Sequence, residues 1–141
     1  MLAAGLWAAT IVAFGFAAGL GGRPDRLAVG TLLASALLST LVKDLQVDDL
    51  RWGVALVDAL AFLLLTALAT RYNRWWLIVA AGLQLVVVLT HVAAIGPGFI
   101  FNWTAVSIRW VTWLALLAAS GTGAIEAHVI RRYRLESHPH A

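Results

Sequence analysis

Long apolar stretches alternate with short polar stretches along this chain of 141 residues. A helix that crosses the apolar core of a membrane needs about 20 mainly apolar residues, within a range of about 17–25. Five stretches reach or approach that length, and segments rich in Gly, Pro, Arg or Asp separate them. The pattern predicts one all-α integral membrane bundle of five transmembrane helices, followed by a short basic cytoplasmic tail at 126–141. The expected spans are about 2–20, 24–42, 52–70, 75–95 and 103–125.

The second stretch is the weakest of the five, because it is short and carries the hydroxyl residues Thr31, Ser35 and Ser39. Pro24 suits the first position of a helix, where its missing N–H costs nothing. A helix that begins at Pro24 is long enough to span, so we retain this stretch as a transmembrane helix.

The composition supports a membrane protein, since 62% of the residues are hydrophobic and only 12% are charged. Soluble domains are typically about 45–50% apolar and about 25% charged. This chain has too little polar surface to coat a soluble globule, which excludes a soluble enzyme, a disordered tail and a nucleic-acid-binding domain. The chain has no cysteine, which also excludes disulfides, thiolate nucleophiles and Cys metal sites.

The arginine and lysine residues predict an orientation. In a five-span topology one side of the membrane holds seven basic residues and the other holds two, Lys43 and Arg51. Because basic residues favour the cytoplasmic side, we expect the N-terminus outside and the C-terminus in the cytoplasm. Without the second span the split would be four against five, with no bias. The seven residues are Arg23, Arg26, Arg71, Arg74, Arg131, Arg132 and Arg134.

Other features agree with this topology. No basic residue precedes the first apolar run, so we interpret that run as a permanent span rather than a cleaved signal peptide. Aromatic residues gather at membrane boundaries. Trp75 and Trp76 are expected at the inner boundary, and Trp52 and Trp103 at the outer one.

Three ionisable residues on three different spans fall in one layer of the outer half. Asp58 and Arg109 each lie about 9 Å inside the outer boundary, and His91 about 6 Å, at about 1.5 Å per residue. Gln84 shares a helix face with His91. A buried charge is costly in a membrane, and such residues often mark functional sites.

Two interpretations of this intramembrane polar cluster stay open. In one, Asp58 is a titrating carboxylate in a proton or cation site, Arg109 tunes it, and His91 is a relay or ligand. In the other, the group is a structural ion pair with His91 hydrogen-bonded nearby. His91 could also bind haem or a chlorophyll-type pigment as an axial ligand. A bis-histidine haem would need a symmetric dimer to supply the second histidine.

Small and hydroxyl residues recur at four-residue spacing on two of the spans. They predict helix-packing faces, either inside the bundle or against another subunit. These residues are Gly5, Ala9, Ala13, Thr31, Ser35 and Ser39.

No catalytic motif is present: there is no phosphate loop, zinc helix motif or nucleophile elbow. We therefore expect a protein that is not an enzyme, and the residues predict no metal site. The sequence requires no cofactor, although haem or pigment stays open through His91.

The stretch Arg71-Tyr72-Asn73-Arg74-Trp75-Trp76, followed by Gln84-Leu85 and Thr90-His91, resembles a pattern in small polytopic inner-membrane proteins of alphaproteobacteria. The resemblance covers about spans three to five. It implies a multi-pass location in the bacterial inner membrane and carries no function.

We expect a non-catalytic accessory subunit of a larger bacterial inner-membrane complex, acting through helix packing. The absence of extramembrane domains, the small-residue faces and the few buried polar groups motivate this hypothesis. The alternatives are a small homo-oligomeric ion- or proton-coupled transporter or channel using Asp58, His91 and Arg109, and a haem- or pigment-binding subunit. The expected partners are the lipid bilayer and other membrane subunits or further copies of the chain, with no nucleic acid.

Overall fold

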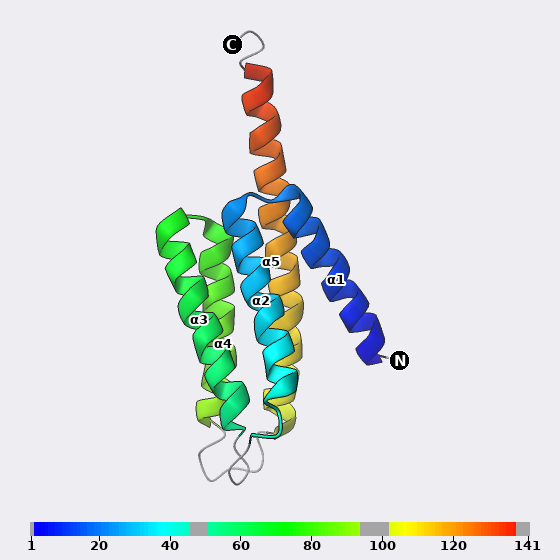
Figure 1. Ribbon diagram of the computed structural model, residues 1–141, viewed down its shortest axis with the longest axis vertical. Coiled ribbons are helices and arrows are strands. Elements are labelled where there is room, and N and C mark those ends of the chain that lie inside the picture. The colour runs from blue at the N-terminus through cyan, green and yellow to red at the C-terminus, as the bar shows by residue number, and fades with distance from the viewer. Residues whose placement is uncertain (1, 46–50, 94–101, 138–141) are drawn as a thin grey trace.

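The computed structural model describes residues 2–45, 51–93 and 102–137, and within them the chain is all-helical (Figure 1). Five helices account for nearly all of this part of the chain, which confirms the predicted five-helix, all-α fold class. They are α1 Leu2–Leu20, α2 Arg23–Leu41, α3 Trp52–Tyr72, α4 Trp75–Ala93 and α5 Asn102–Ser137.

Three helices in the described residues are long and apolar enough to cross a membrane: α3, α4 and the Val106–Tyr133 part of α5. The described side chains of α1 form a shorter apolar segment, Thr10–Leu20. Helix α2 carries charged residues in its first turn, including the buried Asp25, in keeping with the weak second stretch in the sequence. Membrane association thus rests on α3, α4 and α5, and the five-span count stays a prediction.

The helices run alternately in opposite directions, so that the α1–α2 turn, the α3–α4 turn and the C-terminal end of α5 lie at one end (Figure 1). We call this the basic end, because Arg23, Arg26, Arg71 and Arg74 lie in or beside its two turns. Helix α3 packs mainly against α4, and α1 mainly against α5. The first turns of α1 diverge from α2 at the opposite end (Figure 1).

Helix α5 is longer than the expected span at 103–125. It continues through the region expected as a tail and ends at Ser137, and its last turns project beyond the other helices (Figure 1). Its 36 residues give a rod of about 54 Å, against about 30 Å for the apolar core of a bilayer. The guanidinium of Arg131 donates to the carbonyl oxygen of Leu20 over 3.3 Å, which ties this extension to the end of α1.

The two turns at the basic end have clear local causes. Asn73 ends α3 in the left-handed conformation (φ 47°), and its N–H donates to Ala69; asparagine tolerates this conformation better than most residues. At the start of α2, the Asp25 carboxylate accepts the backbone N–H of Gly22 over 2.6 Å. A Cβ at Gly21 would lie 2.4 Å from the carbonyl oxygen of Ala17, so only glycine fits there.

Trp76 joins three helices near the basic end. Its side chain is 1% exposed, and its indole N–H donates to Asp25 Oδ1 over 2.9 Å. Its ring lies so close to Gly123 of α5 that a Cβ there would be 2.5 Å from the indole. Trp76 therefore lies near the basic end but faces the core of the bundle, because a buried carboxylate on α2 and a glycine on α5 create a pocket for its indole.

Trp75, the neighbouring residue, lies at the surface, as a boundary residue would. Its side chain is 49% exposed, and its indole N–H donates to Glu126 Oε2 over 2.6 Å. Arg74 approaches the other oxygen of Glu126 to 3.8 Å. This second tryptophan–carboxylate bond ties α4 to α5 at the surface.

The two tryptophans should differ in their contribution to stability. We expect Trp76→Phe to lower the free energy of unfolding by about 2 kcal/mol, because it leaves a buried Asp25 oxygen without its donor. Trp75→Phe should cost about 0.5 kcal/mol, since water replaces an exposed bond. Unfolding in mixed detergent micelles, followed by circular dichroism, measures both, and equal losses would contradict this account of the basic end.

Candidate functional site

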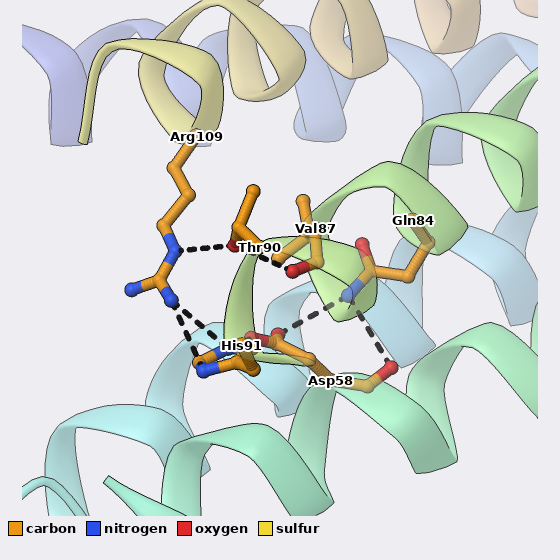
Figure 2. A network of polar contacts seen from close by, with 6 residues as sticks. All are labelled: Asp58, Gln84, Val87, Thr90, His91 and Arg109. Carbon is orange, nitrogen blue, oxygen red and sulfur yellow. Dashed lines mark hydrogen bonds and ion pairs between the residues drawn. The ribbon is translucent and has the colours of Figure 1, made fainter. Parts of the chain in front are cut away.

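The polar side chains of α3, α4 and α5 meet near the end of the bundle opposite the basic end. Asp58 comes from α3, Gln84, Thr90 and His91 from α4, and Arg109 from α5 (Figure 2). Gln84, Thr90 and His91 are buried, and Asp58 and Arg109 are half-buried. The four residues singled out from the sequence, Asp58, Gln84, His91 and Arg109, thus share one site.

His91 lies between the acid and the base. Its Nε2 is 2.8 Å from Asp58 Oδ2, and its Nδ1 is 3.0 Å from Arg109 Nη2. The same Nη2 is 3.2 Å from Nε2, so the guanidinium lies against the ring. Within the described residues, no ion pair joins Arg109 directly to Asp58.

Two neighbours complete the network. Gln84 donates its amide N–H to Asp58 Oδ1 over 3.1 Å, with a weaker contact of 3.5 Å to the backbone oxygen of Asp58. Arg109 Nε donates to the Thr90 hydroxyl over 3.1 Å, and that hydroxyl donates to the carbonyl oxygen of Val87 over 2.6 Å (Figure 2). Both carboxylate oxygens of Asp58 therefore accept hydrogen bonds.

These contacts determine where the proton of His91 lies. Without a proton on Nε2, that nitrogen and Asp58 Oδ2 would be two acceptors 2.8 Å apart, unless Asp58 carried the proton. Arg109 Nη2 lies 3.0 Å from Nδ1 and 3.2 Å from Nε2, so its positive charge lies against the ring and disfavours a second proton on the imidazole. A neutral imidazole protonated at Nε2, beside an ionised Asp58, fits both contacts.

The network therefore contains one negative and one positive charge, linked by a neutral ring. Its total charge is zero, which suits a layer where an unbalanced charge is costly. The guanidinium of Arg109 lies against the imidazole ring, and the ring donates from Nε2 to Asp58. The network holds α3, α4 and α5 together. Whether Nδ1 of His91 can accept a proton depends on the position of the Arg109 guanidinium.

A partly open cavity of about 300 Å³ lies beside this network, and all five helices line it. One wall of the cavity is polar and consists of the charged side chains of Asp58 and Arg109 and the amide of Gln84. Hydroxyl groups come from α1 and α2, and Trp110 and Trp113 of α5 form part of its apolar wall. The site is thus a cavity with polar groups on one wall, at the lower end of the size of ligand pockets.

Some side chains that line the cavity carry polar atoms without a partner among the described residues. Arg109 Nη1 makes no hydrogen bond to any described residue, and Figure 2 shows it pointing away from His91. The Ser39 hydroxyl is likewise without a partner in the described part of the chain. Both groups can donate, so the cavity has unused hydrogen-bond donors.

The predicted packing residues have different surroundings. Ala13 packs against the core, whereas Gly5 and Ala9 lie in α1, where the side-chain surroundings fall outside the described part. The hydroxyls of Thr31 and Ser35 donate to carbonyl oxygens of α2 itself, at Leu27 and Leu32, rather than across a helix contact. Ser35 and Ser39 line the cavity.

In this site His91 is poorly placed to bind haem or a pigment as an axial ligand. Both of its ring nitrogens have partners, and its side chain is buried. Iron ligation would have to break the bond to Asp58 or the bond to Arg109. Among the described residues, no group of three or more His, Cys, Asp or Glu side chains could hold a metal ion.

The sequence pattern did not indicate the wall formed by α1 and α5. Trp113 donates its indole N–H to the Thr10 hydroxyl over 3.1 Å. It also packs edge-on against Phe14, with ring centroids 5.9 Å apart. Trp110 and Trp113 follow Arg109 within about one turn of helix, which in hindsight is the available signal for an aromatic wall next to the charge.

Comparisons of the chain with protein-family models, with curated proteins and with solved structures return no match. The resemblance to alphaproteobacterial membrane proteins therefore stays a prediction, and arguments about function rest on the geometry of this site.

Proposed function

We propose that the protein is a small solute-binding membrane protein, with transport as its class of activity. The cavity lined by all five helices beside the Asp58–His91–Arg109 network carries this proposal. Ligand sites in helical membrane proteins lie between helices and use a few buried polar groups. The cavity forms within a single chain, so the proposal does not require the homo-oligomer considered from the sequence.

The proposed orientation follows the positive charges. With the basic end toward the cytoplasm of a bacterial inner membrane, the N-terminus is outside, the C-terminus is inside and five spans cross the membrane. The cavity then lies in the outer half of the bilayer. We expect solute to enter it from the outside.

A second candidate is the accessory subunit of a larger membrane complex. The projecting end of α5 favours it, since Val129, Ile130 and Tyr133 are exposed there. A short helix without packing partners is marginally stable in water. A partner subunit covering this segment would stabilise it.

One experiment separates these two functions: native mass spectrometry of the protein extracted gently from its own membranes. We expect a non-lipid small-molecule mass on the wild-type chain. Ala36→Phe should remove that mass, because Ala36 lines the cavity. Ala34→Phe is the matched control on the exposed side of α2 and should retain it.

Other outcomes would contradict the solute-binding function. If the chain carries no such mass and purifies with larger subunits, the accessory function replaces it. If Ala34→Phe and Ala36→Phe lose the mass equally, the molecule does not occupy the cavity. The substitutions are chemically identical and two residues apart, so general effects on the helix cancel.

A further inference from the structure

We propose that the cavity binds a small organic anion on the guanidinium of Arg109, and that one proton enters with it at Nδ1 of His91. This inference rests on the proposed solute-binding function and specifies the chemistry of the solute. It starts from the polar atoms of the lining side chains that lack a partner among the described residues.

Among the partnerless polar atoms of the described lining residues, the charged one is a donor, Arg109 Nη1, while Gln84 Oε1 and the Ser39 hydroxyl can accept hydrogen bonds. Both oxygens of Asp58 already accept protons, from His91 and Gln84. Arg109 Nη1 has no partner among the described residues, and the same holds for the Ser39 hydroxyl. A guanidinium edge pairs best with a carboxylate or a similar planar anion. The cavity therefore favours a ligand that brings acceptor oxygens.

The remaining walls of the cavity indicate the chemical character of the rest of the ligand. Trp110, Trp113 and Leu116 of α5 line the cavity, with Val54 and Val87 from α3 and α4. These are apolar or aromatic surfaces, which suit an apolar body. A cavity of about 300 Å³ suits a small aromatic or branched aliphatic carboxylate.

Charge balance explains the accompanying proton. The network is neutral before the ligand enters, so an added anion would leave one uncompensated charge in an apolar layer, which is costly. The positive charge of Arg109 lies against the His91 ring, 3.0 Å from Nδ1, and opposes a proton there. When the guanidinium turns to the anion, its charge moves away from the ring and Nδ1 takes one proton from a hydronium ion or buffer acid of the bulk solution, whose bond to that proton breaks. A new N–H bond forms, no electrons are transferred, and the total charge returns to zero.

The neighbours of His91 are compatible with this step. Asp58 of α3 faces its Nε2 and stabilises an imidazolium, while Gln84 and Thr90 of α4 are uncharged. Helix α2 contributes hydroxyl groups to the cavity wall.

Isothermal titration calorimetry of the full chain in lipid nanodiscs tests this inference with three probes of similar shape: benzoate, benzamide and benzamidine. We expect binding of benzoate alone. Titrations in two buffers of different ionisation enthalpy should show uptake of about one proton, and affinity should therefore fall as the pH rises. Preference for benzamide or benzamidine, or binding of benzoate without proton uptake, would overturn the proposal.

Two variants assign the roles. Arg109→Gln should weaken benzoate binding by at least about tenfold, since a charged hydrogen bond is lost. His91→Gln retains a donor and an acceptor; it should still bind benzoate but without proton uptake or pH dependence. Ala34→Phe, on the exposed side of α2, should bind benzoate like the wild type. Proton uptake retained in His91→Gln would exclude His91 as the acceptor.

The result also separates this inference from the proposed function. If benzoate does not bind but the native spectra still show a small molecule that Ala36→Phe removes, the solute-binding function stands and its solute is not an organic anion. If neither signal appears, both proposals fail.

Discussion

Asp58→Leu is expected to lower the free energy of unfolding by about 3 kcal/mol, the low end of the cost of breaking a buried ion pair. The substitution removes the only described acidic group in the network, so Arg109 becomes an uncompensated charge and His91 and Gln84 lose their acceptor. We place the loss at the low end because Arg109 is half-buried and its long side chain can reach outward to water.

The double variant Asp58→Leu/Arg109→Leu should recover at least about 1 kcal/mol of this loss, because it removes the remaining charge as well. Asp44→Leu is the control for removing an exposed carboxylate beyond the end of α2 and should change stability by less than about 0.5 kcal/mol. Reversible unfolding in detergent micelles measures all three. A double variant no more stable than Asp58→Leu would show that charge balance does not hold this network together.

Gly123→Leu should be similarly damaging, with a loss of about 3 kcal/mol, the upper end of the usual cost of overpacking. A Cβ at Gly123 would lie 2.5–2.6 Å from three atoms of the Trp76 indole. That indole cannot move easily, because it is buried and bonded to Asp25. Either α5 must shift away from α4 or the bond to Asp25 must break.

Gly121→Leu is the matched control, two residues earlier on the same helix. A Cβ there meets nothing within 4 Å, so the substitution should leave stability unchanged or raise it by up to about 1 kcal/mol through the higher helix propensity of leucine. The measurement is again unfolding in detergent, with near-ultraviolet circular dichroism reporting the environment of the tryptophans. Equal losses in the two variants would rule out the close contact with Trp76 as the cause.

Much of the helical architecture could be predicted from the sequence because run length and turn chemistry are local properties. The five apolar runs correspond to five helices, and the Gly-Gly-Arg-Pro and Tyr-Asn-Arg turns lie where expected. The end of α5 was the main departure. No Gly or Pro lies between Glu126 and Ser137, so nothing local stops the helix.

The sequence predicted the depth of the site residues along the bundle, but not which of their side chains touch. Counting residues from the turns places Asp58, His91 and Arg109 in one layer, since the helix rise is constant. Their order could not be predicted, because the rotation of each helix about its axis determines which side chains touch. Helix α3 is apolar almost all round, so its sequence carries no stripe that identifies the inward face.

The number of helices, the direction of each helix and the depth of each polar residue along its helix could be predicted from the residues alone, because hydrogen bonding within each helix and the lengths of the apolar runs set these properties. Tertiary structure alone decided that His91 would stand between Asp58 and Arg109, that Trp76 would be buried against Gly123, and that five helices would enclose a cavity. The physical reason is that each of these depends on the packing of several helices at once, and in apolar helices many rotations bury nearly equal surface until specific polar bonds and close contacts select one.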